Sequence, residues 1–150
     1  MGGLSAGTRR RVGVAQAFMG NPRLVLLDEP TADLDPEERI RLRALLKGIG
    51  DGRTVVVSTH LLDDVKAVCS EVAVLDRGRT GFTGLPEDVT EIAADRVFEL
   101  PRDASEADAP HQSGARRVIA ETPPPGAHPV PPTMEEGYTA LMRDLRAGGR

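Results

Sequence analysis

The sequence predicts an α/β fold in which helices flank a parallel sheet, followed by a small C-terminal α+β extension. Short apolar runs that end at polar residues alternate along the chain with longer segments of helical periodicity. The first run, Leu24–Leu27, leads directly into Asp28 and Glu29 and stops at Pro30. Such a run is typical of a strand buried on both faces of a parallel sheet, and ligands bind beyond the carboxyl ends of these strands. We therefore expect a site at Asp28 and Glu29, where one carboxylate could hold Mg²⁺ and the other could orient a water. The alternative is that Asp-Glu-Pro simply ends the strand.

Composition narrows the class of protein. The chain has 150 residues, 39% of them hydrophobic and 28% charged, which fits one domain or part of a larger one. A net charge of -4 argues against a nucleic-acid partner. Cys69 is the single cysteine, so a reducing compartment is expected. Because no apolar run is long enough for a membrane span or a signal peptide, we expect a cytoplasmic protein without direct membrane insertion.

The first helix is predicted after Ser5, which is a plausible N-cap. Val12, Ala15 and Met19 follow at helical spacing, and Gly20-Asn21-Pro22 ends the pattern. A glycine-bearing turn that opens a helix points backbone N–H groups outward and can bind a phosphate. An ordinary helix cap is the more common meaning of such a sequence.

A second helix is predicted from Asp35, an N-cap with Pro36 at the first helical position. Its expected apolar face consists of Leu42, Leu45, Leu46 and Ile49. Thr54–Ser58 then reads as a second buried strand, rich in β-branched residues. It places His60 at a carboxyl end like that of Asp28 and Glu29, where an imidazole could contact a phosphate or a water. A lone histidine there is more often a cap or a packed side chain.

Val72–Leu75 is predicted as a third buried strand, and the turn at Asp76–Arg79 predicts a hairpin with Thr80–Thr83. A short helix is expected after Gly84, with Pro86 in its first turn. These elements complete a predicted domain over residues 1–93.

Residues 94–150 are predicted to form the C-terminal extension. Arg96–Leu100 and Arg116–Ala120 read as partner strands around a flexible loop at 101–115. Residues 122–132 contain six prolines and read as a stiff connector. Thr133 and Glu136 have the spacing of a capping box, so a terminal helix is expected over 133–147. Its apolar face is expected to dock on another element.

Four motifs, in this order, resemble the C-terminal half of an ABC transporter ATP-binding subunit, a family with a P-loop NTPase-like fold. Leu4-Ser5-Ala6-Gly7-Thr8 resembles the signature motif LSGGQ, with Ala6 at a glycine position and Thr8 at the glutamine position. Leu24–Asp28 with Glu29 resembles the Walker B strand and its catalytic glutamate. Thr31–Asp35 resembles the D-loop, and Ser58-Thr59-His60 resembles the switch-histidine segment. The proline-rich tail is similar to the extension of some bacterial exporter subunits.

The resemblance implies ATP and Mg²⁺ as cofactors and a division of roles at the predicted site. Asp28 would hold Mg²⁺, Glu29 would polarise the attacking water, and His60 would contact the γ-phosphate. Phosphoryl transfer depends on this kind of positioning and charge stabilisation.

The resemblance also implies partners. The signature residues would cap the γ-phosphate of a nucleotide held by a second ATP-binding subunit, and Asp35 would line the interface of that dimer. These signature residues are Ser5, Ala6, Gly7 and Thr8. A membrane permease would hold the assembly at the inner face of the cytoplasmic membrane, where it would power export.

The phosphate loop G-x-x-x-x-G-K-[ST] does not occur in the sequence, whose only lysines are Lys47 and Lys66. We therefore expect no appreciable ATP binding or hydrolysis by this chain alone. The chain is expected to be either a truncated ATP-hydrolysing subunit or a non-catalytic half-site that supplies the signature motif in trans. A split enzyme lies between these alternatives.

Overall fold

A computed structural model describes residue 3 and residues 5–49, 52–100 and 116–148. Leu4 of the predicted signature motif and the predicted loop at 101–115 lie outside the described residues. The chain divides into two compact units, Met1–Ser70 and Glu71–Arg150. Their elements are α1 (Ala6–Ala17), β1 (Leu24–Asp28), α2 (Pro36–Gly48), β2 (Thr54–Ser58), α3 (Leu62–Val68), β3 (Val72–Asp76), β4 (Arg79–Gly84), α4 (Pro86–Glu91), β5 (Val97–Leu100), β6 (Arg116–Ile119), β7 (His128–Pro129) and α5 (Met134–Gly148).

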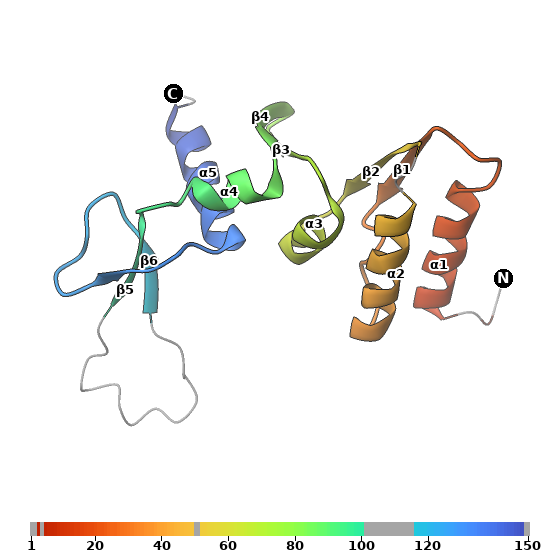
Figure 1. The fold of residues 1–150 in the computed structure, drawn as a ribbon, viewed down its shortest axis with the longest axis horizontal. Helices are drawn as coiled ribbons and strands as arrows, with labels where there is room; N and C mark the ends of the chain where they lie inside the picture. Colours follow the sequence, from red (N-terminus) through yellow and green to blue (C-terminus); the bar gives the residue numbers. More distant parts are fainter. Residues whose placement is uncertain (1–2, 4, 50–51, 101–115, 149–150) are drawn as a thin grey trace, which may run out of the picture. The chain divides into compact units, whose positions relative to one another are not determined.

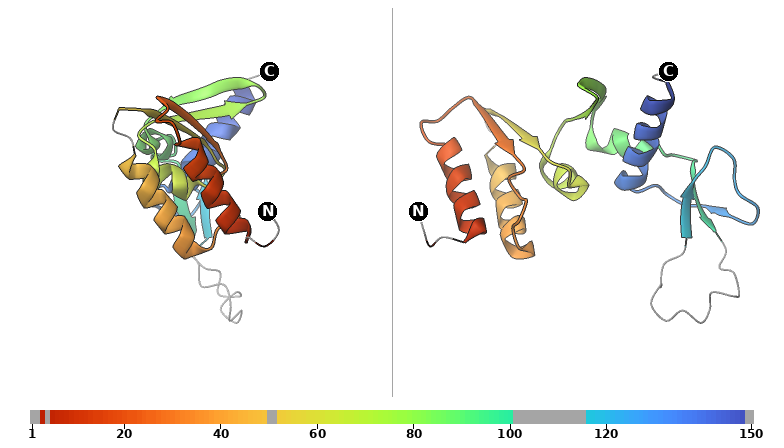
Figure 2. Two further views of the ribbon diagram at one scale, coloured as in Figure 1. Left: turned by 90° about the vertical axis from the view of Figure 1, so that its right-hand side faces the viewer. Right: turned by 180° about the vertical axis from the view of Figure 1, so that it is seen from behind.

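The first unit is built on a parallel pair of strands. β1 pairs with β2 in a register that runs from Leu24 opposite Thr54 to Asp28 opposite Ser58. Helices α1 and α2 lie side by side and cover one face of this pair (Figures 1 and 2). The core between them consists of Val14, Val25, Leu27, Leu34, Leu42 and Leu46. The predicted α/β class is thereby confirmed.

The prediction that Leu24–Leu27 is buried on both faces is wrong for the described residues. Val25 and Leu27 are buried, whereas Leu24 and Leu26 are 56% and 69% exposed. Side chains alternate between the two faces of a strand, and α1 and α2 cover only one of them. Val56 of β2 is likewise exposed, so the second face of the pair is open among the described residues.

The predicted caps of the first two helices are confirmed. Ser5 accepts a hydrogen bond from the N–H of Thr8 at 3.1 Å, and Asp35 accepts one from the N–H of Glu38 at 2.8 Å. The predicted apolar face of α1 is wrong, because Val12 and Met19 are exposed. The residue that α1 buries against β1 is Val14.

The predicted face of α2 holds in part. Leu42 and Leu46, one turn apart, are buried, whereas Leu45 is exposed. The covered stripe is therefore narrower than the full periodic pattern, since only one side of α2 meets the sheet.

The second unit begins with a β3–β4 hairpin. The strands pair antiparallel, and the turn residues Arg77 and Gly78 both have positive φ, 50° and 76°. Tight hairpin turns of this hand require that geometry. The predicted hairpin is confirmed, and among the described residues β3 and β4 form a two-stranded sheet. The expectation that Val72–Leu75 is a buried strand is also wrong, because Val74 is buried and Leu75 is 70% exposed.

The C-terminal segment folds as the sequence pattern predicts. β5 pairs antiparallel with β6 and, on its other edge, with β7, which lies inside the proline-rich connector. The capping box forms: the N–H of Thr133 donates to Glu136 Oε2 at 2.8 Å, and the N–H of Glu136 donates to Thr133 Oγ1 at 3.3 Å. Helix α5 docks on α4 (Figure 2), with Gly137 against the main chain of Val89.

The boundary between the two units falls between Ser70 and Glu71, so residues 71–93 belong to the same unit as the C-terminal segment. The sequence-based boundary between residues 93 and 94 remains a prediction. Within the described ranges, none of the helices is long and apolar enough to cross a bilayer.

Candidate functional site

The carboxyl ends of β1 and β2 bring the predicted catalytic residues together. Because Asp28 is paired with Ser58 in the parallel register, the Ser58 hydroxyl donates a hydrogen bond to Oδ1 of Asp28. Ser58 was assigned no role from the sequence. The contact could have been predicted from the lengths of the two strands. Strands of equal length that pair from their first residues have their last residues side by side.

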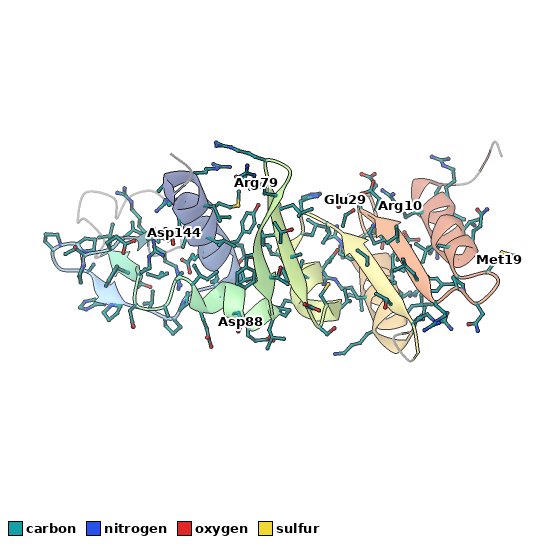
Figure 3. All side chains as sticks on the ribbon, turned by 90° about the horizontal axis from the view of Figure 1, so that it is seen from above. Arg10, Met19, Glu29, Arg79, Asp88 and Asp144 are labelled. Atoms are coloured by element: carbon teal, nitrogen blue, oxygen red, sulfur yellow. The ribbon has the colours of Figure 1, made fainter. Side chains whose placement is uncertain are left out.

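Glu29 follows Asp28 in an unusual backbone conformation. Its φ is 45°, in the left-handed region that non-glycine residues rarely adopt. Its N–H continues the ladder by donating to the Ser58 carbonyl at 2.9 Å. Such a conformation costs about 1–3 kcal/mol and persists where surrounding contacts determine it. It marks Glu29, labelled at the end of β1 in Figure 3, as a functional candidate.

The segment after β2 surrounds the carboxylate of Glu29. Oε1 of Glu29 lies 2.8 Å from Nδ1 of His60 and accepts the His60 backbone N–H at 3.1 Å. The Thr59 hydroxyl donates to Oε2 at 3.4 Å. The carboxylate is 31% exposed and the His60 ring 72% exposed, so both reach solvent. A carboxylate held in this way can accept a hydrogen bond from a water, and the imidazole can contact an anion beside it.

Asp28 fits a Mg²⁺ ligand in its donor chemistry. Mg²⁺ is usually bound through one or two carboxylates, with water and substrate phosphates completing the shell. Asp28 is exposed, and the hydroxyl of Ser58 is hydrogen-bonded to its carboxylate. No group of three or more His, Cys, Asp and Glu residues suited to a metal is found in the described part of the chain. Asp28 could therefore contribute one carboxylate to a Mg²⁺ site, where the ion would supply positive charge.

An open pocket of about 460 Å³ lies between α1 and β1, and its wall includes Leu26, Asp28, Asp33 and Arg10. Arg10 reaches from α1 towards the end of β1, where its Nη1 is 3.5 Å from the carbonyl oxygen of Asp28 (Figure 3). Both acidic and basic groups therefore border the pocket at the Asp28 end. Glu29 and His60 are not among its lining residues.

The predicted signature residues form the first turn of α1. Ser5 Oγ lies 2.9 Å from Thr8 Oγ1 in addition to capping the Thr8 N–H. Ala6 is the first helical residue. Gly7 is buried against Glu38, and a Cβ at position 7 would require the flexible end of the Glu38 side chain to move. No sequence pattern predicts that contact.

An ion pair joins α1 to the first turn of α2. Arg11 Nη2 lies 2.9 Å from Oε1 of Glu38, while Asp35 caps the same turn of α2. The predicted signature and D-loop segments thus lie on neighbouring helix ends of one unit (Figure 1). The predicted residues form two groups, one at the β1–β2 ends and one at these helix N-termini.

Comparison with protein families gives a match to the model described as ABC transporter over residues 1–32. The chain is 40% identical over 120 residues to the methionine import ATP-binding protein MetN of Myxococcus xanthus, which covers 77% of this chain and 36% of the relative. It is 39% identical over 106 residues to the phosphonates import ATP-binding protein PhnC of Ruegeria pomeroyi, covering 69% and 39%. The chain thus spans about a third of the length of these curated relatives.

Solved structures show the same relationship in three dimensions. The post-hydrolysis dimer of an ATP-binding cassette with ADP and Pi matches with a TM-score of 0.51 and 33% identity, covering 55% of this chain and 36% of that one. The protein cbiO1 of Clostridium perfringens, part of the ABC transporter complex cbiONQ, matches with a TM-score of 0.51 and 36% identity, covering 57% and 35%. The fold is therefore a mixed α/β fold that matches ABC ATPase domains. Over the part of their length that it spans, the chain is similar to ABC transporter ATP-binding proteins.

Proposed function

We propose that this chain is the C-terminal part of the ATP-hydrolysing subunit of an ABC transporter. The observation that carries the proposal is the contact between Glu29 and His60 at the carboxyl ends of two parallel strands, directly after Asp28. In this role Asp28 holds Mg²⁺, Glu29 orients and polarises the attacking water, and His60 contacts the γ-phosphate. Positioned charges of this kind supply most of the catalysis in phosphoryl transfer.

The proposed assembly has a second ATP-binding subunit and a membrane permease as partners. Ser5, Gly7 and neighbouring amides of α1 cap the nucleotide of the second subunit, and Asp35 lies at that interface. The ATP-binding cassette with ADP and Pi is a dimer, and cbiO1 is part of a transporter complex, which supports this arrangement. The permease holds the chain at the inner face of the cytoplasmic membrane.

The proposed direction of transport is export, because the C-terminal segment resembles the extension of some bacterial exporter subunits. The relatives named above are import proteins, so their similarity supports ATP-driven transport without supporting export. Export therefore remains a prediction based on residues 94–150.

A fusion protein tests the catalytic roles. The region that precedes the signature motif in MetN, the relative named above, is joined before Leu4 to supply the phosphate loop, and ATP turnover is measured. We expect Glu29→Gln to lower kcat by about 10²-fold or more, the usual cost of losing a general base. Glu37→Gln is the matched control, since Glu37 is exposed on α2 and pairs with Arg41. Equal turnover in an active fusion and its Glu29→Gln variant would refute the assignment.

The second candidate is a half-site that supplies its signature motif in trans. It is favoured by the formed Ser5 cap and the close fit of Gly7 in a chain without a phosphate loop. A relative with an intact phosphate loop and a disabled signature motif should then regain turnover on mixing with this chain. No recovery at any mixing ratio would exclude this role for that pair.

A further inference from the structure

A buried polar cluster joins the first residue of the predicted D-loop, Thr31, to α3. Thr31 and Asp64 are 1% and 2% exposed. Oδ2 of Asp64 accepts a hydrogen bond from Thr31 Oγ1, and Oδ1 accepts one from Nε of Arg43 at 2.7 Å and another from Nη2 of the same guanidinium. Both carboxylate oxygens therefore have partners, as a buried charge requires.

The two ends of this cluster lie close in sequence to the two residues of the candidate site. Thr31 is separated from Glu29 only by Pro30, a buried residue whose ring restricts the backbone. Asp64 lies in the first turn of α3, which begins two residues after His60. The bond from Thr31 to Asp64 therefore ties the loop that carries Glu29 to the helix that follows His60.

The backbone of Glu29 needs to be held by its surroundings. Its left-handed backbone is unfavourable in isolation and requires its neighbours to hold it. A buried ion pair often adds little stability compared with apolar side chains of similar volume. What the Arg43–Asp64–Thr31 cluster supplies is a directional link between two segments, and no apolar contact fixes direction in the same way.

We propose that Asp64, acting through Thr31, is a positioning residue that holds the Glu29 carboxylate against His60. Arg43 supplies the opposite charge and anchors Asp64 from α2, so the loss of the Thr31 hydroxyl leaves the ion pair in place. The meaning of this role for ATP hydrolysis rests on the proposed function. The geometric relationship itself rests only on the contacts described above.

The test compares Thr31→Val, which removes the hydroxyl at nearly constant shape, with Thr31→Ser, which keeps it. The readout in the full 150-residue chain is the NMR resonance of the His60 backbone N–H, the group that donates to Glu29 Oε1. Glu29→Gln defines the resonance position after the carboxylate is lost. We expect Thr31→Val to move this resonance at least halfway to that position, and we expect Thr31→Ser to leave it near the wild-type value.

An unchanged His60 resonance in a folded Thr31→Val variant would overturn the proposal, whatever happens to the melting temperature. The proposal would also be overturned if Thr31→Ser moved the His60 resonance as far as Thr31→Val does, because loss of the hydroxyl would then not be the cause. If Thr31→Val does not fold, Thr31→Ala is measured against the same reference positions. The resonance does not depend on nucleotide, so equal turnover of an active fusion protein and its Glu29→Gln variant would refute the proposed function and leave this result standing.

Discussion

His60 contacts Glu29 twice, through Nδ1 at 2.8 Å and through its backbone N–H at 3.1 Å, both to the same oxygen Oε1. The second contact does not depend on the imidazole. The main chain after β2 therefore holds the Glu29 carboxylate even without the ring. The left-handed backbone of Glu29 is the cost of this arrangement.

That backbone predicts an inverted order of substitutions at position 29. Both Glu29→Gly and Glu29→Ala lose the carboxylate, but only glycine adopts φ near 45° without strain. We expect Glu29→Gly to be more stable than Glu29→Ala by about 1 kcal/mol in urea denaturation. At Arg41, which is exposed in the middle of α2, we expect the reverse order: Arg41→Ala should be more stable than Arg41→Gly by about 1 kcal/mol. The same order at both positions would contradict the strained conformation.

Because one face of the β1–β2 pair is open, we expect alanine substitutions of two neighbouring leucines to change the free energy of unfolding by very different amounts. Leu27 is 7% exposed, so Leu27→Ala should cost about 2–5 kcal/mol of unfolding free energy. Leu26 points to the open face, and Leu26→Ala should change stability by no more than about 0.5 kcal/mol.

The same face, together with the strand edges left unpaired among the described residues, predicts that the isolated chain is poorly stable and associates with itself. Light scattering at increasing concentration should show this association, and Leu26→Ala should reduce it. A sharp, cooperative melt of a monomeric wild-type chain would argue against this expectation.

Close packing of two helices in the second unit predicts that Gly137 tolerates no side chain. A Cβ at Gly137 would meet the carbonyl of Val89, a main-chain group of α4 that cannot turn aside. We expect Gly137→Ala to destabilise this unit by about 1–3 kcal/mol through overpacking. Gly148→Ala, in the same helix with nothing near its Cβ, is the control and should leave the melting temperature almost unchanged.

The Arg117–Glu136 pair predicts loss of stability in acid. Hydrogen bonds from Arg117 are the main cause of a Glu136 pKa below its usual value of 4.5. A lowered pKa means that folding favours the ionised carboxylate, so its contribution is complete above about pH 5 and is lost as the pH falls through the folded pKa. The melting temperature of Glu136→Gln should therefore fall less than that of the wild type over this range. Glu135→Gln, at an exposed neighbouring position, should behave like the wild type.

The lack of a phosphate loop predicts that the 150-residue chain alone has no ATPase activity. Phosphate-binding backbone N–H groups and the loop lysine are needed to hold the nucleotide, and neither Lys47 nor Lys66 belongs to such a loop. Phosphate release from Mg²⁺-ATP should remain at the buffer rate. Turnover by the pure chain that is abolished by Glu29→Gln would overturn this expectation.

Much of the candidate site was predictable because strand ends carry readable signals. Asp28, Glu29 and His60 each follow an apolar run, and parallel strands place such ends at one edge of a sheet. The contacts that orient them were not predictable. Ser58, Thr59 and Thr31 have short polar side chains that are common in turns, and their partners depend on the register and rotamers of the folded chain.

Local interactions explain what the sequence by itself determined. Three helix caps, at Ser5, Asp35 and Thr133, and the turn at Arg77-Gly78 depend only on residues close together in the sequence. The free energy that stabilises each of them therefore comes from a short segment of the chain. These features appear in the structure where the sequence predicts them.

Only the tertiary structure decided which apolar face of β1 is covered and which charged groups are paired. A run such as Leu24–Leu27 is apolar on both sides, and burial depends on which helices pack against it. The bond from Thr31 to Asp64 closes a separation of 33 residues, and that from Arg43 to Asp64 closes 21. Such contacts form only after the chain entropy of bringing distant segments together has been offset by packing, and no local pattern encodes them.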